Sequence, residues 1–255
     1  LSPLEMAQDL ASKPDNDWQD LMFGPALMQN YALSVKGGGK YSTYYNSVGY
    51  TNQDGVMKGT NYQRYTLQSK QDFKKGIFQA GTNVVLTYDQ SNPLYSVIRG
   101  GMVGHTLQAI PTWEQYDENR TGGYGGLYGD VVNLTHPLGM VDDNLMKRYS
   151  DNVKIFANAY VSVELMKGLK YKLNLTPDFQ FYRYNSYEGL FDFGLAKHDI
   201  TAVTEQQTRT RNILVENLLT FDRTFGDHKV SALVGYTYQD LSLIHISEPT
   251  RPISI

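Results

Sequence analysis

The stretch that decides the fold is KIFANAYVSVEL at residues 154–165. Every second residue from Ile155 to Leu165 is apolar, whereas most residues between them are polar, such as Asn158 and Glu164. A helix would scatter these two sets around its circumference, but a strand places them on opposite faces. The stretch therefore predicts a long strand with one apolar face and one polar face.

The same alternation recurs along most of the chain. It is clear in four further segments and weaker, but rich in Tyr, Thr and β-branched residues, in three others. In chain order these segments are 31–35, 42–51, 62–73, 78–88, 169–175, 208–225 and 230–238. Eight strands are therefore expected. Several reach about ten residues, which is longer than is usual in soluble domains and enough to cross a membrane when tilted.

The connections between these strands alternate in length. Short links such as KKG, MKG and FGDHK take turns with long ones at 52–61, 91–150 and 186–207. Outer-membrane barrels have tight turns on the periplasmic side and long loops outside, whereas a soluble sandwich has no reason to separate them. Six tyrosines lie near strand ends, as expected for rings at a membrane boundary: Tyr31, Tyr50, Tyr88, Tyr171, Tyr236 and Tyr238.

The composition excludes several classes of function. A formal charge of −3 gives no basic face for nucleic acid, and the absence of cysteine excludes disulfides and thiolate zinc sites. No apolar run reaches the length of a membrane-spanning helix. Leu1 is not an initiator Met, and LSPLEMAQDL lacks the basic start of a signal peptide, so we expect the chain to begin inside a longer protein.

Several motifs resemble the SusC/RagA family of TonB-dependent outer-membrane transporters. NDWQDLMF at 16–23 is followed by MQNYALSVKGG at 28–38 and by STYYNSVGYTNQDGVMKGTNYQRYTL at 42–67. Later, NAYVSVELMKGLKYKLNL at 158–175 and ENLLTFDRTFGDHKVSALVGY at 216–236 are similar to further family segments. The motifs occur in the family's order, so the resemblance covers nearly the whole chain.

The resemblance implies an all-β fold, namely about eight antiparallel strands of an incomplete 22-stranded transmembrane β-barrel without its plug domain. It implies an integral protein of the Gram-negative outer membrane that contacts lipid, a SusD-like surface lipoprotein, and the TonB complex through the plug. The implied activity is import of oligosaccharides or peptides, with no cofactor and no catalysis. An outer-membrane barrel enzyme and a secreted β-sandwich carbohydrate-binding module remain as alternatives.

The same comparison divides the chain into segments. The expected divisions are an extracellular loop at 1–26, four strands at 27–90, a long extracellular loop at 91–150, four further strands with a loop at 186–207 in 151–240, and a tail at 241–255.

The tail, LSLIHISEPTRPISI, departs from the family pattern. LSLIHISEPTR can be translated back into one uninterrupted DNA sequence. That DNA sequence resembles the transposase-end and adapter DNA used to prepare sequencing libraries. We therefore expect 241–255 to be non-native and assign His245 no role. The alternative is a real strand, because DLSLIHI also alternates.

No catalytic, cofactor or metal residue is nominated. The other histidines lack metalloprotease spacing and are expected to be solvated in loops: His105, His136, His198 and His228. The Gly-rich segment 121–130 lacks the Lys-Ser/Thr of a phosphate-binding loop. Isolated calcium in PDNDW or YDENR stays an alternative, although neither has the glycine and distal Glu of an EF-hand loop.

Recognition is expected in loop 91–150, because long external loops carry binding residues. Its aromatic side chains could stack on sugar rings or peptide side chains: Trp113, Tyr116, Tyr124 and Tyr128. The alternative is that these rings pack the loop onto itself or onto the lipoprotein. Three inward residues are expected to line the lumen or contact the plug: Asn158, Ser162 and Glu164.

Overall fold

The computed structural model describes residue 9 and residues 11–93, 101–127 and 134–249. In chain order its elements are α2 (Trp18–Met22), β1 (Met28–Gly38), β2 (Ser42–Asp54), β3 (Asn61–Lys75), β4 (Phe78–Asn92), α3 (Gly101–Gln108), the 3-10 helix η1 (Gly139–Val141), β5 (Met146–Met166), β6 (Leu169–Glu188), β7 (Phe191–Asp192), β8 (Lys197–His198), β9 (Ala202–Phe225) and β10 (His228–Pro249). Neither helix described here has the length and hydrophobicity to span a bilayer.

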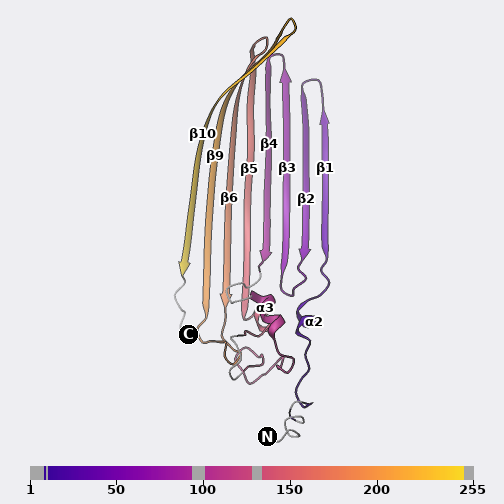
Figure 1. Ribbon diagram of the computed structural model, residues 1–255, viewed down its shortest axis with the longest axis vertical. Helices are drawn as coiled ribbons and strands as arrows, with labels where there is room; N and C mark the ends of the chain where they lie inside the picture. Colours follow the sequence, from indigo (N-terminus) through magenta and orange to yellow (C-terminus); the bar gives the residue numbers. More distant parts are fainter. Residues whose placement is uncertain (1–8, 10, 94–100, 128–133, 250–255) are drawn as a thin grey trace.

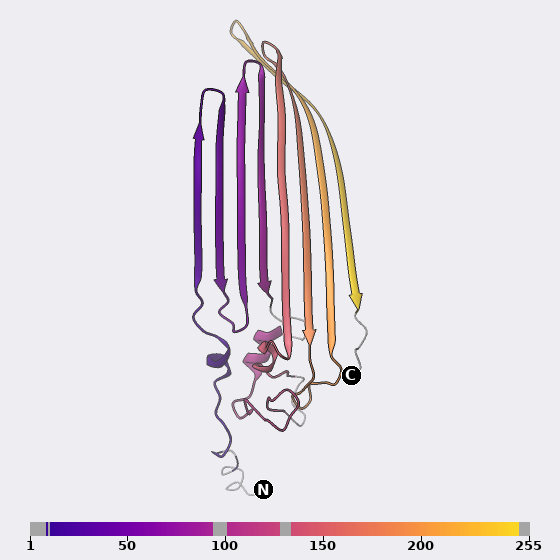
Figure 2. The ribbon, with the colours of Figure 1, turned by 180° about the vertical axis from the view of Figure 1, so that it is seen from behind.

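Eight of these strands form one antiparallel sheet in the order β1-β2-β3-β4-β5-β6-β9-β10. Pairing runs along nearly whole strands, as between β3 and β4 from Asn61↔Asn92 to Lys75↔Phe78. Figures 1 and 2 show one curved sheet in which β1 and β10 are the two edges. The prediction of about eight antiparallel strands is therefore confirmed, and the sheet is open rather than closed.

The short connections gather at one end of the sheet, at the top of Figure 1, and the long ones at the other. In three of the short turns a glycine has a positive φ: Gly76 (+60°), Gly168 (+86°) and Gly226 (+56°). Residues with a side chain disfavour a positive φ, which explains why KKG, MKG and FGDHK contain glycine. The predicted segregation of short and long connections is confirmed.

The strands extend further into the predicted loops than the alternation indicated. β5 begins at Met146 rather than after 150, and β6 and β9 leave only 189–201 between them rather than 186–207. The extra strand residues are largely polar, and Arg148 and Ser150 turn their side chains into a buried cluster at the loop end. In these extra residues apolar and polar side chains do not alternate, although the backbone hydrogen bonds between the strands continue.

One face of the sheet is mostly apolar and exposed. A row of register-paired tyrosines crosses β1–β4 on this face: Tyr31, Tyr50, Tyr65 and Tyr88. Neighbouring ring centroids in the row are 6.4, 4.9 and 6.3 Å apart. Of the other three tyrosines expected near strand ends, Tyr171 lies close to the β5–β6 turn, whereas Tyr236 and Tyr238 lie near the middle of β10.

At the loop end, segments distant in sequence fold together beneath the sheet. We call this body the loop cap and define it as residues 11–24, 55–60, 101–127, 134–145 and 189–201. The cluster of buried apolar side chains lies in or beside it: Trp18, Met22, Met57, Met102, Trp113, Leu127, Leu134, Leu138, Met140, Leu145, Met146, Phe191 and Phe193. The hydrophobic core of the chain is therefore in its loops and not between sheets.

Candidate functional site in the loop cap and on the polar face

The loop cap is held by contacts between its first and middle segments. Helix α2 begins at the N-cap Asp17, whose carboxylate accepts from the backbone N–H groups of Gln19 (2.9 Å) and Asp20 (3.1 Å). The helix buries Trp18, whose Nε1 donates to the carbonyl of Ile110 at 2.8 Å. The DWQD motif therefore starts a helix that attaches to a segment about ninety residues away.

His136 occupies the centre of the cap and is fully buried. Four aromatic rings surround its imidazole, with centroids between 4.7 and 5.7 Å away: Trp18, Trp113, Tyr124 and Phe193. Its Nδ1 accepts from the N–H of Gly139, so in the neutral form Nε2 carries the proton and faces the carbonyl of Glu114 at 3.1 Å. In the uncharged ring both nitrogens therefore have a hydrogen-bond partner.

Burial sets the protonation of this cluster. It lowers the pKa of His136 to about 4, although the hydrogen bond to the Glu114 carbonyl opposes the shift. Burial also lowers the pKa of His105, whose Nδ1 accepts from the N–H of Thr135 at 2.9 Å. The expectation that His105 and His136 are solvated is wrong, because His105 is 1% exposed and His136 lies in LTHPLGM, residues 134–140, which is buried throughout. That apolar run was the signal in the sequence for burial.

The predicted contact residues occupy different environments. Trp113 is 2% exposed and packs inside the cap, so it supports the packing alternative. Tyr124 is half-buried and donates to Asp142 at 2.9 Å; burial, and then this hydrogen bond, raise the pKa of its hydroxyl. Tyr116 is 64% exposed, and its ring lies 5.5 Å from that of Tyr124. Tyr128 lies outside the described residues.

The polar face of the sheet carries two groups of hydrogen-bonded side chains, which together involve β3, β4, β5, β6 and β9. Gln79 donates to the hydroxyl of Tyr160 at 3.1 Å, and that hydroxyl donates to Asp72 at 2.8 Å, above Gly81. Further along, Asn158 donates to Asn174 at 2.9 Å, and Asn174 donates to Glu216 at 2.7 Å. This face can therefore border water, and within the described residues no three His, Asp or Glu side chains gather as a metal site.

The chain is similar in sequence to several proteins named TonB-dependent receptor. It is 29% identical over 238 residues to TonB-dependent receptor P3 of Formosa agariphila and 26% identical over 244 residues to receptor P26 of the same organism. These matches cover 88% and 92% of this chain. It is also 26% identical over 153 residues, 59% of its length, to TonB-dependent receptor SusC of Bacteroides thetaiotaomicron.

The chain is similar to TonB-dependent receptors of the SusC/RagA type.

A solved structure supports the fold of this receptor segment. The structure of the RagAB peptide transporter superposes with a TM-score of 0.73 over 92% of the chain at 18% identity, and the match covers 27% of that chain. The segment spans about a quarter of the length of the receptors P3 and P26. No family model matches it.

The similarity to these receptors indicates the setting of the two faces of the sheet. SusC/RagA-type receptors are β-barrels of the outer membrane and are transport proteins rather than enzymes. In barrels of this class the outward apolar face contacts lipid and the polar face borders the lumen, and the sheet has one face of each kind. Such barrels place short turns on the periplasmic side and long loops outside the cell, so we expect the same orientation for the short turns and the loop cap.

Proposed function

We propose that this segment forms part of the wall and outer loops of an importer for oligosaccharides or peptides, driven through TonB. The observation that carries the proposal is the alignment of nearly the whole segment with TonB-dependent receptors. The hydrogen-bonded polar face supports it, because a path for hydrophilic substrate needs a wall that water can wet.

Tyr116 is the described side chain best placed to meet such a substrate. Its ring is exposed on the cap, and its neighbour Tyr124 is fixed by the hydrogen bond to Asp142. A rigid pair of aromatic faces suits both a sugar ring and an apolar peptide side chain. The name of the RagAB transporter favours peptides as the first class to test.

The partner we propose is a SusD-like lipoprotein that covers the loop cap. Support comes from large apolar side chains exposed on the cap, of which Leu107 is 58% and Ile200 is 62% exposed. Exposed apolar area of this kind is typical of surfaces that another protein covers. The TonB contact belongs to the plug of the full-length receptor.

The test is uptake by cells that produce the full-length receptor with single substitutions, numbered as in this segment. We expect Tyr116→Ala to lower the uptake of labelled oligopeptides or oligosaccharides about fivefold, since stacking on one aromatic ring contributes about 1 kcal/mol. Glu118→Gln, at an exposed side chain of the same loop, should leave uptake unchanged. Deletion of the receptor gene without loss of uptake of either class would refute the proposal.

A further inference from the structure

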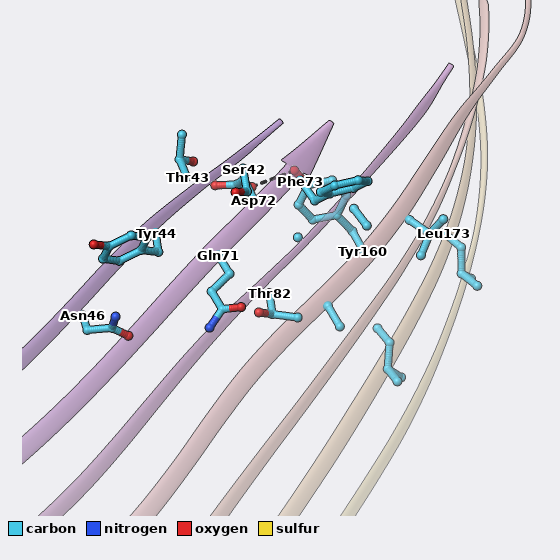
Figure 3. Close-up of a pocket in the computed structure, with 15 residues that line it drawn as sticks. Ser42, Thr43, Tyr44, Asn46, Gln71, Asp72, Phe73, Thr82, Tyr160 and Leu173 are labelled. Atoms are coloured by element: carbon cyan, nitrogen blue, oxygen red, sulfur yellow. Dashed lines mark hydrogen bonds between the residues drawn. The ribbon is translucent and has the colours of Figure 1, made fainter. Parts of the chain in front are cut away.

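The lipid face has a hollow near its periplasmic end. It extends across β2–β6 and has a volume of about 720 Å³, within the range of small-molecule sites. Small side chains of β4 and β5 form its floor: Ala80, Thr82 and Ala159. Larger ones border it, with Phe73 of β3 on one side and Leu173 of β6 on the other (Figure 3). The hollow is thus a groove between two apolar ridges.

The strand register places this groove inside the bilayer. Phe73 is eight residues beyond Tyr65 on β3, a distance of about 27 Å along a strand, or about 20 Å across the membrane at a tilt of 40°. The apolar band of such barrels is about 25 Å tall. With the tyrosine row at the outer boundary, the groove lies in the periplasmic leaflet.

Polar side chains border the groove although they face lipid. Figure 3 shows Asn46 of β2 and Gln71 of β3 on the side of Tyr44. Within the described residues neither side chain has a hydrogen-bond partner. A polar group in hydrocarbon is costly without one, so the occupant should be apolar and also carry hydrogen-bonding groups. The acyl ester of a glycerolipid combines both.

Two ammonium groups lie beyond the groove at the periplasmic surface. Lys75 follows Phe73 by two residues on the same side of β3, and Lys40 lies in the adjacent β1–β2 turn. Both approach the ring of Tyr41, with Nζ 5.2 Å from its centroid for Lys40 and 5.8 Å for Lys75. Both are exposed, and the described part of the chain offers neither a carboxylate partner. An anionic headgroup would satisfy this pair.

We propose that the groove is a binding site for one anionic phospholipid of the periplasmic leaflet. Its phosphate binds Lys40 and Lys75, an ester group meets Gln71, and one acyl chain lies over Ala80 and Ala159. A second copy of the receptor is the poorer occupant, because a symmetric contact here would oppose the two lysine pairs. The site is independent of the transported substrate.

The test uses the full-length receptor, purified in detergent and depleted of lipid. Native mass spectrometry then measures the binding of phosphatidylglycerol and of phosphatidylcholine with identical acyl chains. We expect at least one phosphatidylglycerol bound per receptor, and a Lys40→Gln/Lys75→Gln variant should bind it about tenfold more weakly. Ala159→Phe, which fills the groove, should weaken both lipids.

The matched control is Lys167→Gln/Lys229→Gln, since these lysines are also exposed at periplasmic turns but lie away from the groove. It should bind phosphatidylglycerol as the wild type does. Each variant must migrate as a folded, heat-modifiable band. Equal binding by the Lys40/Lys75 variant and the wild type, equal affinity of the wild type for the two lipids, or a lipid-free dimer would each overturn the proposal.

Discussion

At the scale of single residues, burial gives His136 a role that its type does not reveal. The neutral ring satisfies both of its nitrogens inside an aromatic cluster, and the charged ring would place a second N–H against the N–H of Gly139. The imidazole therefore acts as an uncharged hydrogen-bonding core residue. A histidine in a loop of an outer-membrane protein becomes part of the packing that shapes the outer surface.

This environment predicts a pH dependence of the loop cap. The pKa of His136 is about 4 in the folded cap, below the ordinary value of 6.5, so the unfolded cap binds more protons between these pH values. Cap stability should fall as the pH is lowered from 6.5 to 4, by about 3 kcal/mol at most, and level off below. The shift of His105 has the same sign. Protease cleavage within 101–127 of the folded receptor, followed from pH 7 to 4.5, measures the effect.

His136→Gln separates the titration from the packing, because an amide keeps a donor and an acceptor but carries no charge in this range. The variant should be less stable at pH 7 and yet lose most of the pH dependence, with the remainder due to His105. If wild type and variant became cleavable over the same pH range to the same extent, His136 would not be the titrating group.

Gly81 gives a second prediction at this scale, on the polar face. A Cβ there would lie 2.6 Å from both Asp72 Oδ1 and Tyr160 Cε1, so Gly81→Ala should break their hydrogen bond and cost about 1–3 kcal/mol. Gly49→Ala is the control, since its Cβ meets nothing closer than 3.8 Å. The temperature at which the folded band is lost should drop for Gly81→Ala alone. Equal drops would indicate a general cost of replacing glycine.

At the scale of elements, β5 shows why the sheet was predictable from the sequence. Its alternation from Ile155 to Leu165 is local, and the short turn at 167–168 pairs it with β6, whereas its pairing with β4 follows the long connection 93–145. The same strand shows the limit of prediction from sequence. Met146–Ser150 pairs with β6 but packs into the cap, and apolar and polar residues do not alternate along it. The alternation of apolar and polar residues therefore predicts the part of a strand that has one lipid-exposed face. It does not predict the part that extends beyond that face.

The loop cap lay beyond the reach of sequence patterns. Its defining contacts join residues 92 to 97 positions apart, such as Trp18 with Ile110 and Asn16 with Trp113. Neither a hydrophobic period nor a turn motif predicts contacts between residues so far apart in the sequence. The residue type of Trp113 predicts either substrate contact or packing of the loop, and the contact of α2 with the middle of the chain buries the side chain.

The second half of β10 carries a prediction about the gene. Leu241–Pro249 pairs with β9 in unbroken register, from Leu241↔Asn212 to Pro249↔Thr204. Pairing does not decide its origin, because any alternating segment that follows a strand can extend the ladder. We expect the source genome to encode different residues after about 240. Amplification and sequencing across that codon is the measurement, and recovery of LSLIHISEPTR from genomic DNA would contradict a non-native tail.

At the scale of the whole molecule, the open sheet predicts that the segment depends on the rest of the receptor. β1 and β10 each leave a row of backbone N–H and C=O groups without a neighbouring strand. In water such edges pair with other chains, and in lipid each unsatisfied group costs several kcal/mol. Within the described residues the cluster of buried apolar side chains lies in or beside the loop cap, so it does not cover the apolar face of the sheet.

Residues 1–240 produced alone should therefore aggregate, whereas the same residues within the full-length receptor should fold in the outer membrane. Fractionation and size-exclusion chromatography distinguish the two outcomes, and refolding into detergent micelles tests whether lipid-like solvent alone is sufficient. We expect it to be insufficient, because a detergent micelle covers the apolar face but leaves both edges unpaired. A soluble, monodisperse monomer of 1–240 would mean that the sheet has another way to protect its edges, which favours the secreted sandwich over the barrel.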